Sequence, residues 1–154
     1  MKIEIRYAKL EDATRLVEIY RYYVEKTAIT FEYKVPSIEE FQQRMIHVME
    51  KYPYLVAKMD DQIVGYAYAS TFNVRMAYDW CAETSIYVDH MLRKCGVGKR
   101  LYQALEKVLK AQNITNLNAC ISSPIENAHL IGDCQKVGTL KDAISQAYQI
   151  TREI

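Results

Sequence analysis

A short glycine-containing segment lies between an apolar strand and a long amphipathic helix, within Ile86–Ala111. Gly96 and Gly98 are separated by one residue, and the helical pattern of apolar residues begins at Val97. The first N–H groups of a helix have no intrahelical acceptor, and the helix dipole is positive at that end, so this segment can bind an anion. Cationic side chains flank the glycines, and these are Arg93, Lys94, Lys99 and Arg100. We therefore expect the segment to bind the phosphate groups of a ligand.

Two common phosphate-binding motifs do not fit this segment. A P-loop needs a glycine five residues before Gly98, where this chain has Arg93. It also needs serine or threonine after Lys99, where the chain has Arg100. A dinucleotide-binding fingerprint needs a third glycine where the chain has Leu101. The sequence therefore disfavours both a P-loop and a dinucleotide site.

One carboxylate lies inside an apolar strand, which the pattern predicts over Cys81–Asp89. Burying Glu83 there is costly unless the side chain is paired or has a function. A partly buried carboxylate can act as a general base in a proton transfer. The alternative is a glutamate on the solvated face of the strand, or one paired with a structural arginine. From spacing alone the two interpretations stay open.

The order of the predicted elements is β-α-α-β-β-β-α-β. Asp12 can cap the first helix, and Ser37 begins the second with a capping box that includes Glu40. The expected strands are Ile3–Tyr7, Tyr54–Met59, Ile63–Thr71, Cys81–Asp89 and Asn116–Ser122. The second and third strands form an antiparallel hairpin, whereas the glycine segment belongs to a βαβ unit. This order predicts an α+β fold with a sheet of mixed direction, in one domain of residues 1–154.

The composition excludes several classes of function. The net charge of +1 gives no argument for binding nucleic acid, and no apolar run is long enough for a membrane span. The cysteines Cys81, Cys95, Cys120 and Cys134 form no pattern typical of disulfides or zinc, so we expect reduced thiols in a cytoplasmic protein. The histidines also lack metal-ligand spacing, so no metal site is expected.

The glycine segment resembles that of a known superfamily. Arg93–Gly98 matches the R/Q-x-x-G-x-G/A loop of the GNAT acetyltransferases, including the preceding strand and the following helix. Ala77–Trp80 and Ala82–Val88 are similar to phosphinothricin N-acetyltransferases and to relatives that act on methionine sulfoximine or sulfone. The resemblance implies the GNAT fold, a mostly antiparallel sheet flanked by helices. It also implies an N-acetyltransferase that uses acetyl-CoA, acts on a small amino-acid-like amine and forms a homodimer.

The resemblance also implies roles for individual residues. Glu83 is implied as the general base that takes the amine proton, directly or through water. Arg75 and Tyr78 are implied to contact the carboxylate and backbone of the substrate, and Phe31 to lie near it. An arginine suits a carboxylate because it binds both oxygens at once. The residues implied to bind acetyl-CoA are Ile86, Tyr87, Val88, Arg93, Lys94, Cys95, Gly96, Val97, Gly98, Lys99 and Asn127.

The C-terminal part departs from the family pattern. The segment between Asn127 and Val137 is shorter than in relatives. His129 can therefore be matched equally well to the family histidine or to the segment that directly follows Asn127. After Leu140 the expected strands are replaced by a predicted helix. Two alternatives to a small-molecule enzyme therefore stay open. One is a degenerate relative that binds acyl-CoA or a partner without catalysis, and the other is an enzyme that acetylates a protein N-terminus or lysine.

Overall fold

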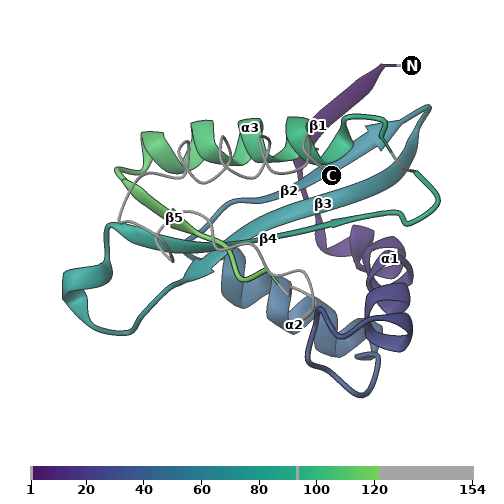
Figure 1. The fold of residues 1–154 in the computed structure, drawn as a ribbon, viewed down its shortest axis with the longest axis horizontal. Coiled ribbons are helices and arrows are strands. Elements are labelled where there is room, and N and C mark those ends of the chain that lie inside the picture. Colours follow the sequence, from purple (N-terminus) through teal and green to yellow (C-terminus); the bar gives the residue numbers. More distant parts are fainter. Residues whose placement is uncertain (1, 93, 122–154) are drawn as a thin grey trace, which may run out of the picture.

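The computed structural model describes residues 2–92 and 94–121 of the chain. Its five-stranded sheet has the order β1-β2-β3-β4-β5 (Figure 1). The pairs β1–β2, β2–β3 and β3–β4 are antiparallel, and β4–β5 is parallel. The strands are β1 (Ile3–Tyr7), β2 (Tyr54–Met59), β3 (Gln62–Thr71), β4 (Cys81–Val88) and β5 (Asn116–Asn118). The helices are α1 (Ala13–Lys26), α2 (Ile38–Met49) and α3 (Val97–Ala111), with 3₁₀ turns η1 (Leu10–Asp12) and η2 (Met76–Tyr78). The predicted α+β fold with a mixed, mostly antiparallel sheet is confirmed.

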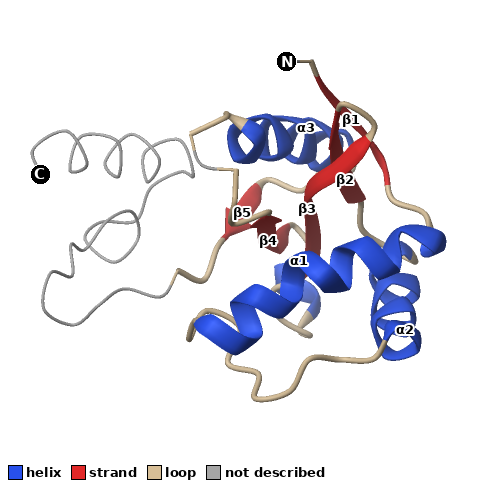
Figure 2. Ribbon diagram, turned by 90° about the vertical axis from the view of Figure 1, so that its right-hand side faces the viewer, coloured by secondary structure: helices blue, strands red, loops and turns tan. Residues whose placement is uncertain are grey.

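Helices cover both faces of the sheet, with α1 and α2 on one side and α3 on the other (Figure 2). Because side chains alternate along a strand, β2 supplies both layers. Tyr54 and Val56 pack with Tyr66 of β3 under α1 and α2. Leu55 and Ala57 belong to the second cluster, which contains Leu105 of α3. The central strands are therefore buried on both faces and form a rigid support for the connections at their ends.

Some element boundaries differ from the prediction. β4 ends at Val88 instead of Asp89, because the side chain and main chain of Asp89 form the turn that follows. β5 ends at Asn118, before the predicted end at Ser122. The hydroxyl of Ser37 accepts a hydrogen bond from the amide of Glu40, as the capping box predicts. The predicted C-terminal helix lies outside the described residues.

Asp12 stands at the N-terminal boundary of α1, but the predicted capping bond is wrong. Its carboxylate instead accepts two hydrogen bonds from the guanidinium of Arg6, each 2.8 Å long, and one from the amide of Lys9 at 2.8 Å. The side chain is only 8% exposed. Burial raises the pKa of Asp12, but the bonds from Arg6 and Lys9 outweigh burial and lower it overall. This ion pair joins β1 to the start of α1.

We predict that Asp12→Asn lowers the free energy of unfolding by about 2 kcal/mol at pH 7, because it removes the charge that Arg6 binds. Since the native pKa of Asp12 is lowered, this contribution is full above the ordinary value of 3.8 and is lost as the pH falls through the native pKa. Urea unfolding at several pH values measures the difference. Glu11→Gln, in an exposed pair with Lys9, is the control and should change little. An equal loss in both variants would contradict the prediction.

Candidate functional site

The main-chain groups of β4 point alternately to its two neighbours. The amide of Asp89 donates to the carbonyl of Val64 at 2.8 Å, so Asp89 is hydrogen-bonded to β3. Because bonded positions alternate in antiparallel pairs, Ser85 and Tyr87 also direct their main-chain groups to β3. The amides and carbonyls of Ile86 and Val88 therefore point to the opposite edge.

That opposite edge is paired with β5 along only part of its length. β5 pairs with Cys81, Ala82 and Glu83, and the hydroxyl of Thr84 adds one bond to the carbonyl of Asn118 at 3.0 Å. Beyond this point no strand of the described residues pairs with this edge of β4, while β3 continues along the other edge. From Thr84 to Val88 the edge extends over roughly 13 Å. The sheet thus opens after Glu83 and leaves main-chain groups that can bind an extended ligand.

The start of α3 lies next to this open edge. A Cβ atom built on Gly98 would lie 3.7 Å from Ile86 Cδ1 and 3.9 Å from Val88 Cγ2. The amide of Arg100 donates to the carbonyl of Gly96, so the three amides before it have no intrahelical acceptor. No side chain of the described residues caps this end of the helix. The open edge of β4 therefore leads directly to a helix terminus that can bind an anion.

The glycine segment turns sharply before α3. Gly96 has φ of +74° and Lys94 has φ of +60°, and both values lie in the left-handed region. Gly96 has no neighbour within 4 Å of an added Cβ, so its φ, and not steric crowding, is the reason for glycine there. Lys94, Cys95 and Lys99 are exposed beside it. Arg93 and Asn127, also predicted to bind the cofactor, lie outside the described residues.

Glu83 is half-buried at the point where the sheet opens. Its neighbours in β4, Ala82 and Thr84, are buried on the α3 side, so the carboxylate of Glu83 points to the face covered by α1 and α2. Tyr68 of β3 lies on the same face, opposite Ser85 in the register of the two strands. Burial raises the pKa of Tyr68, and the charge of Glu83 adds to this effect. The predicted base and the partly buried side chain of Tyr68 are therefore diagonal neighbours on one face of the sheet.

A small cavity of about 90 Å³ lies on the same face of the sheet. The hydroxyl of Tyr66, which is among its lining residues, is buried and has no hydrogen-bond partner in the described part of the chain. Glu32 accepts hydrogen bonds from Tyr20 and Arg44, each 2.8 Å long. The side-chain bond with Glu32 raises the pKa of Arg44, so this guanidinium is charged. The cavity is thus polar at one end and aromatic at the other.

The predicted substrate residues lie on two exposed loops. Phe31, in the loop between α1 and α2, is 78% exposed and has φ of +53°. Arg75 and Tyr78 lie in the loop between β3 and β4, where the ring of Tyr78 packs on Phe72 at 5.8 Å. Figure 1 shows the first loop at the lower right and the second at the left. No contact among the described residues joins either loop to Glu83.

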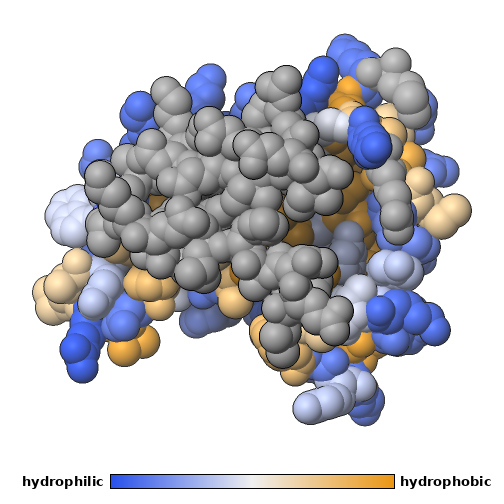
Figure 3. Space-filling model, viewed as in Figure 1, coloured by the Kyte–Doolittle hydropathy of each residue, from blue (hydrophilic) through white to orange (hydrophobic). Residues whose placement is uncertain are grey.

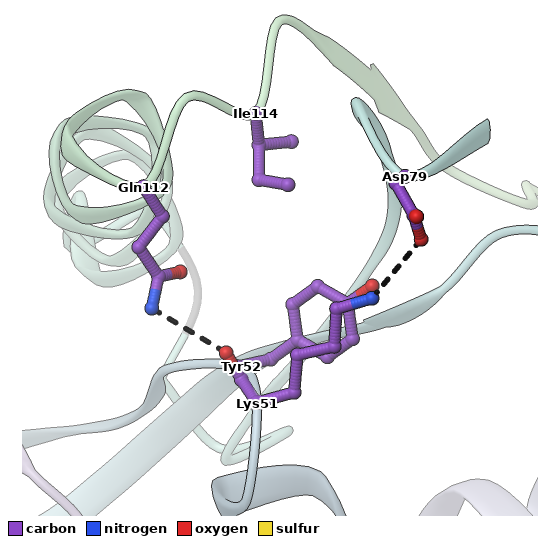
Figure 4. Close-up of a pocket in the computed structure, with 5 residues that line it drawn as sticks. All are labelled: Lys51, Tyr52, Asp79, Gln112 and Ile114. Atoms are coloured by element: carbon purple, nitrogen blue, oxygen red, sulfur yellow. Dashed lines mark hydrogen bonds and ion pairs between the residues drawn. The ribbon is translucent and has the colours of Figure 1, made fainter. Parts of the chain in front are cut away.

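The loop between β3 and β4 has an apolar surface and is held by an ion pair to the segment after α2. Val74 and Met76 are almost fully exposed, and hydrophobic and hydrophilic side chains mix at the lower left of Figure 3, where the loop projects. Lys51 of the segment after α2 binds Asp79 at 3.3 Å, and Gln112 donates to the carbonyl of Lys51 at 3.4 Å (Figure 4). These residues surround a pocket of about 330 Å³. The residues around this pocket hold the loop in place. Because the pocket lies at the opposite end of α3 from the glycine segment, it is distinct from the site at β4.

Sequence patterns did not reveal Tyr68, Glu32 or Arg44. The alternation of side chains along β3 predicts that Tyr66 and Tyr68 share one face of the sheet. The register that brings Tyr68 opposite Ser85 depends on how β3 and β4 pair, which no local pattern shows. No group of residues suited to a metal ion occurs within residues 2–92 and 94–121. The helices in that part of the chain include none long and apolar enough to cross a membrane.

Residues 5–140 match the Acetyltransferase (GNAT) domain family. The chain therefore belongs to the GNAT acetyltransferases, as its glycine segment and order of elements predict. The open edge of β4 and the start of α3 lie in the matched region.

Individual relatives agree with this assignment. The chain is 32% identical over 122 residues to the phosphinothricin N-acetyltransferase of Streptomyces viridochromogenes, covering 79% of this chain and 67% of that protein. A structure of a phosphinothricin acetyltransferase (Pat) from Sinorhizobium meliloti in complex with AcCoA has a TM-score of 0.76 and 35% identity, covering 79% of this chain and 67% of that one. An N-acetyltransferase from Staphylococcus aureus Mu50 has a TM-score of 0.77 and 29% identity, with coverage of 82% and 77%.

We predict different effects on stability for the two glycines. Gly96→Ala should lower the free energy of unfolding by about 1 kcal/mol, because its left-handed φ disfavours a Cβ atom. Gly98→Ala should not destabilise the protein, because it is helical and an added Cβ would make ordinary contacts. Urea unfolding of both variants measures this. Equal destabilisation of the two would contradict the assigned geometry.

Proposed function

We propose that this protein transfers an acetyl group from acetyl-CoA to the amine of a small amino-acid-like substrate. The observation that carries the proposal is the open edge of β4, which runs from the level of Glu83 to the uncapped start of α3. Membership of the GNAT family supports the reaction. The phosphinothricin acetyltransferases among its relatives support the substrate class.

The described residues fit acetyl-CoA along this edge. The pyrophosphate accepts hydrogen bonds from the amides at the start of α3, and Lys94 and Lys99 add positive charge nearby. The pantetheine arm pairs with the outward main-chain groups of Ile86 and Val88, as an added strand does. Tyr87 contributes differently, because its main-chain groups face β3 and its ring packs among the tyrosines under α1. With the pantetheine arm paired to β4 in this way, the thioester of acetyl-CoA lies at the level of Thr84.

Glu83 supplies the base for the transfer. The amine nitrogen forms a bond to the acetyl carbon while the carbon–sulfur bond breaks and CoA leaves as a thiol or thiolate. The amine loses one proton, which the carboxylate of Glu83 accepts directly or through water. The proposal gives Cys81 and Cys95 no role as nucleophiles. The transfer is direct, without an acetylated protein residue.

The substrate approaches from the face covered by α1 and α2. Arg75 binds the substrate carboxylate, and Tyr78 and Phe31 contact the rest of the molecule. Their exposed positions leave the side chains accessible to a ligand. Tyr68, which is close to Glu83, extends this face toward the cavity.

An acetyl-transfer assay tests the proposal. The chain is incubated with acetyl-CoA and methionine sulfone or phosphinothricin, and thiol release is followed with a thiol reagent. Thiol release that depends on the amine supports acetyltransferase activity. If no thiol is released, calorimetry with acetyl-CoA alone shows which part of the proposal fails. Binding without turnover indicates a non-catalytic relative, whereas no binding refutes the cofactor site.

We predict that Glu83→Gln lowers kcat by about 10²–10⁴-fold, because the amide cannot accept the amine proton. The dissociation constant for acetyl-CoA should stay unchanged, since Glu83 points away from the open edge. Steady-state kinetics and calorimetry measure the two quantities. Glu106→Gln, on the exposed side of α3, is the matched control. Unchanged kcat in Glu83→Gln would remove the base assignment.

We predict that Arg75→Ala raises the KM for the amino-acid substrate about tenfold or more, because a charged hydrogen-bonded pair is lost. The same substitution should have little effect on a substrate whose carboxylate is replaced by a carboxamide. Kinetics with both substrates measure this difference. Arg21→Ala, which removes an exposed arginine of α1, is the control. If Arg75→Ala affects both substrates equally, Arg75 does not bind the carboxylate.

A further inference from the structure

Helix α1 contacts three successive residues where β4 runs into the connection to α3. These residues are Val88, Asp89 and His90, and each is held by a different side chain of α1. Figure 1 shows α1 below the right-hand end of the sheet, where this connection begins. The connection is thus held from the side opposite to α3.

Tyr23 holds the last peptide group of the open edge. Its hydroxyl donates a hydrogen bond to the carbonyl of Val88. The amide at the other end of the same peptide, that of Asp89, donates to Val64. Both polar ends of this planar group are therefore fixed. A carbonyl oxygen has two lone pairs, so the oxygen of Val88 can still accept a bond from a ligand amide.

Arg15 holds the first turn of the connection. Its guanidinium donates to the carboxylate of Asp89 and to the carbonyl of Ile63, the latter at 3.0 Å. The other carboxylate oxygen of Asp89 accepts from the amide of Met91 at 3.0 Å, and the carbonyl of Asp89 accepts from Leu92 at 2.9 Å. The direction of the chain after β4 is thus set by one carboxylate that Arg15 fixes.

The third contact is between aromatic rings. Tyr22 stacks on His90 with parallel planes and ring centroids 3.9 Å apart. The next residue, Met91, is 77% exposed, whereas Leu92 packs against the cluster that contains the leucines of α3. The start of the connection is therefore held by α1, and its later part by packing on the α3 side.

We propose that Tyr23 and Arg15 are positioning residues for acetyl-CoA: Tyr23 orients the main-chain edge that pairs with the pantetheine arm, and Arg15 places the segment that binds the pyrophosphate. This inference rests on the proposed function. Neither side chain takes part in proton transfer. Their effect is to hold the site in its binding geometry before the ligand arrives, which lowers the cost of ordering it.

The first test is acetyl-CoA binding by Tyr23→Phe, measured by calorimetry. Loss of one hydrogen bond should weaken binding about threefold to tenfold. The KM for the amine at saturating acetyl-CoA should stay unchanged. Tyr7→Phe, which removes a hydroxyl from an exposed tyrosine of β1, is the matched control. Equal affinity of Tyr23→Phe and wild type would overturn the role of Tyr23.

The second test uses acetyl-pantetheine, a donor without the pyrophosphate, and compares kcat/KM for Tyr23→Phe and Arg15→Gln. Tyr23→Phe should lose activity with both donors, because it acts on the arm. Arg15→Gln should lose about tenfold with acetyl-CoA and little with acetyl-pantetheine, because it acts on the phosphate segment. Equal losses of both variants with both donors would indicate general destabilisation and overturn the inference.

Wild-type binding separates this inference from the proposed function. If the wild type binds no acetyl-CoA, both proposals fail. If the wild type binds and transfers the acetyl group while both variants behave as it does, only the positioning roles fail.

Discussion

The separation of β5 from β4 after Glu83 is the constraint on which the site depends. Main-chain N–H and C=O groups need partners, and a central strand normally finds them on both sides. Here β4 keeps β3 along its length but pairs with β5 only at its start. The outward groups near Ile86 and Val88 can bond to a ligand, and the same edge ends at a helix terminus that also has unused amides. Continuity between these two features suits a long ligand with a phosphate at one end.

The alternation of β4 directs its outward main-chain groups and the side chain of Glu83 to different sides of the strand. Outward main-chain groups lie in the plane of the sheet, whereas the side chain of Glu83 points out of that plane toward α1 and α2. In the proposed reaction, one short strand therefore serves the donor along its edge and the acceptor on its face. Alanines of the strands and leucines of α3 fill the other face of the sheet. Direct transfer between two bound substrates needs such an arrangement, because both must reach one point from different directions.

Local features of this site could be predicted from sequence, whereas tertiary ones could not. Gly96 and the amphipathic helix after it are encoded within a few residues, and the structure gives them as expected. Glu83 could be proposed as a base from sequence because a carboxylate in an apolar strand stands out, and the structure places it half-buried in β4. Asp12 shows the limit, since its type and position predicted a cap, but Arg6 of the preceding strand competes for the same carboxylate. The contact of Tyr23 with Val88 joins residues 65 positions apart, and no local pattern encodes it.

Tyr87 connects the acceptor face with the donor edge. Its ring makes edge contacts with Tyr20 at 5.0 Å and with Tyr23 at 5.2 Å between centroids. Tyr20 holds Glu32, the neighbour of Phe31, while Tyr23 holds the carbonyl of Val88. Since Tyr20 and Tyr23 are three residues apart, they lie on one side of α1, and Tyr87 packs against both. Close packing resists independent movement of such side chains. One aromatic cluster around Tyr87 therefore joins the side of α1 that holds Glu32 to the side that holds the end of β4.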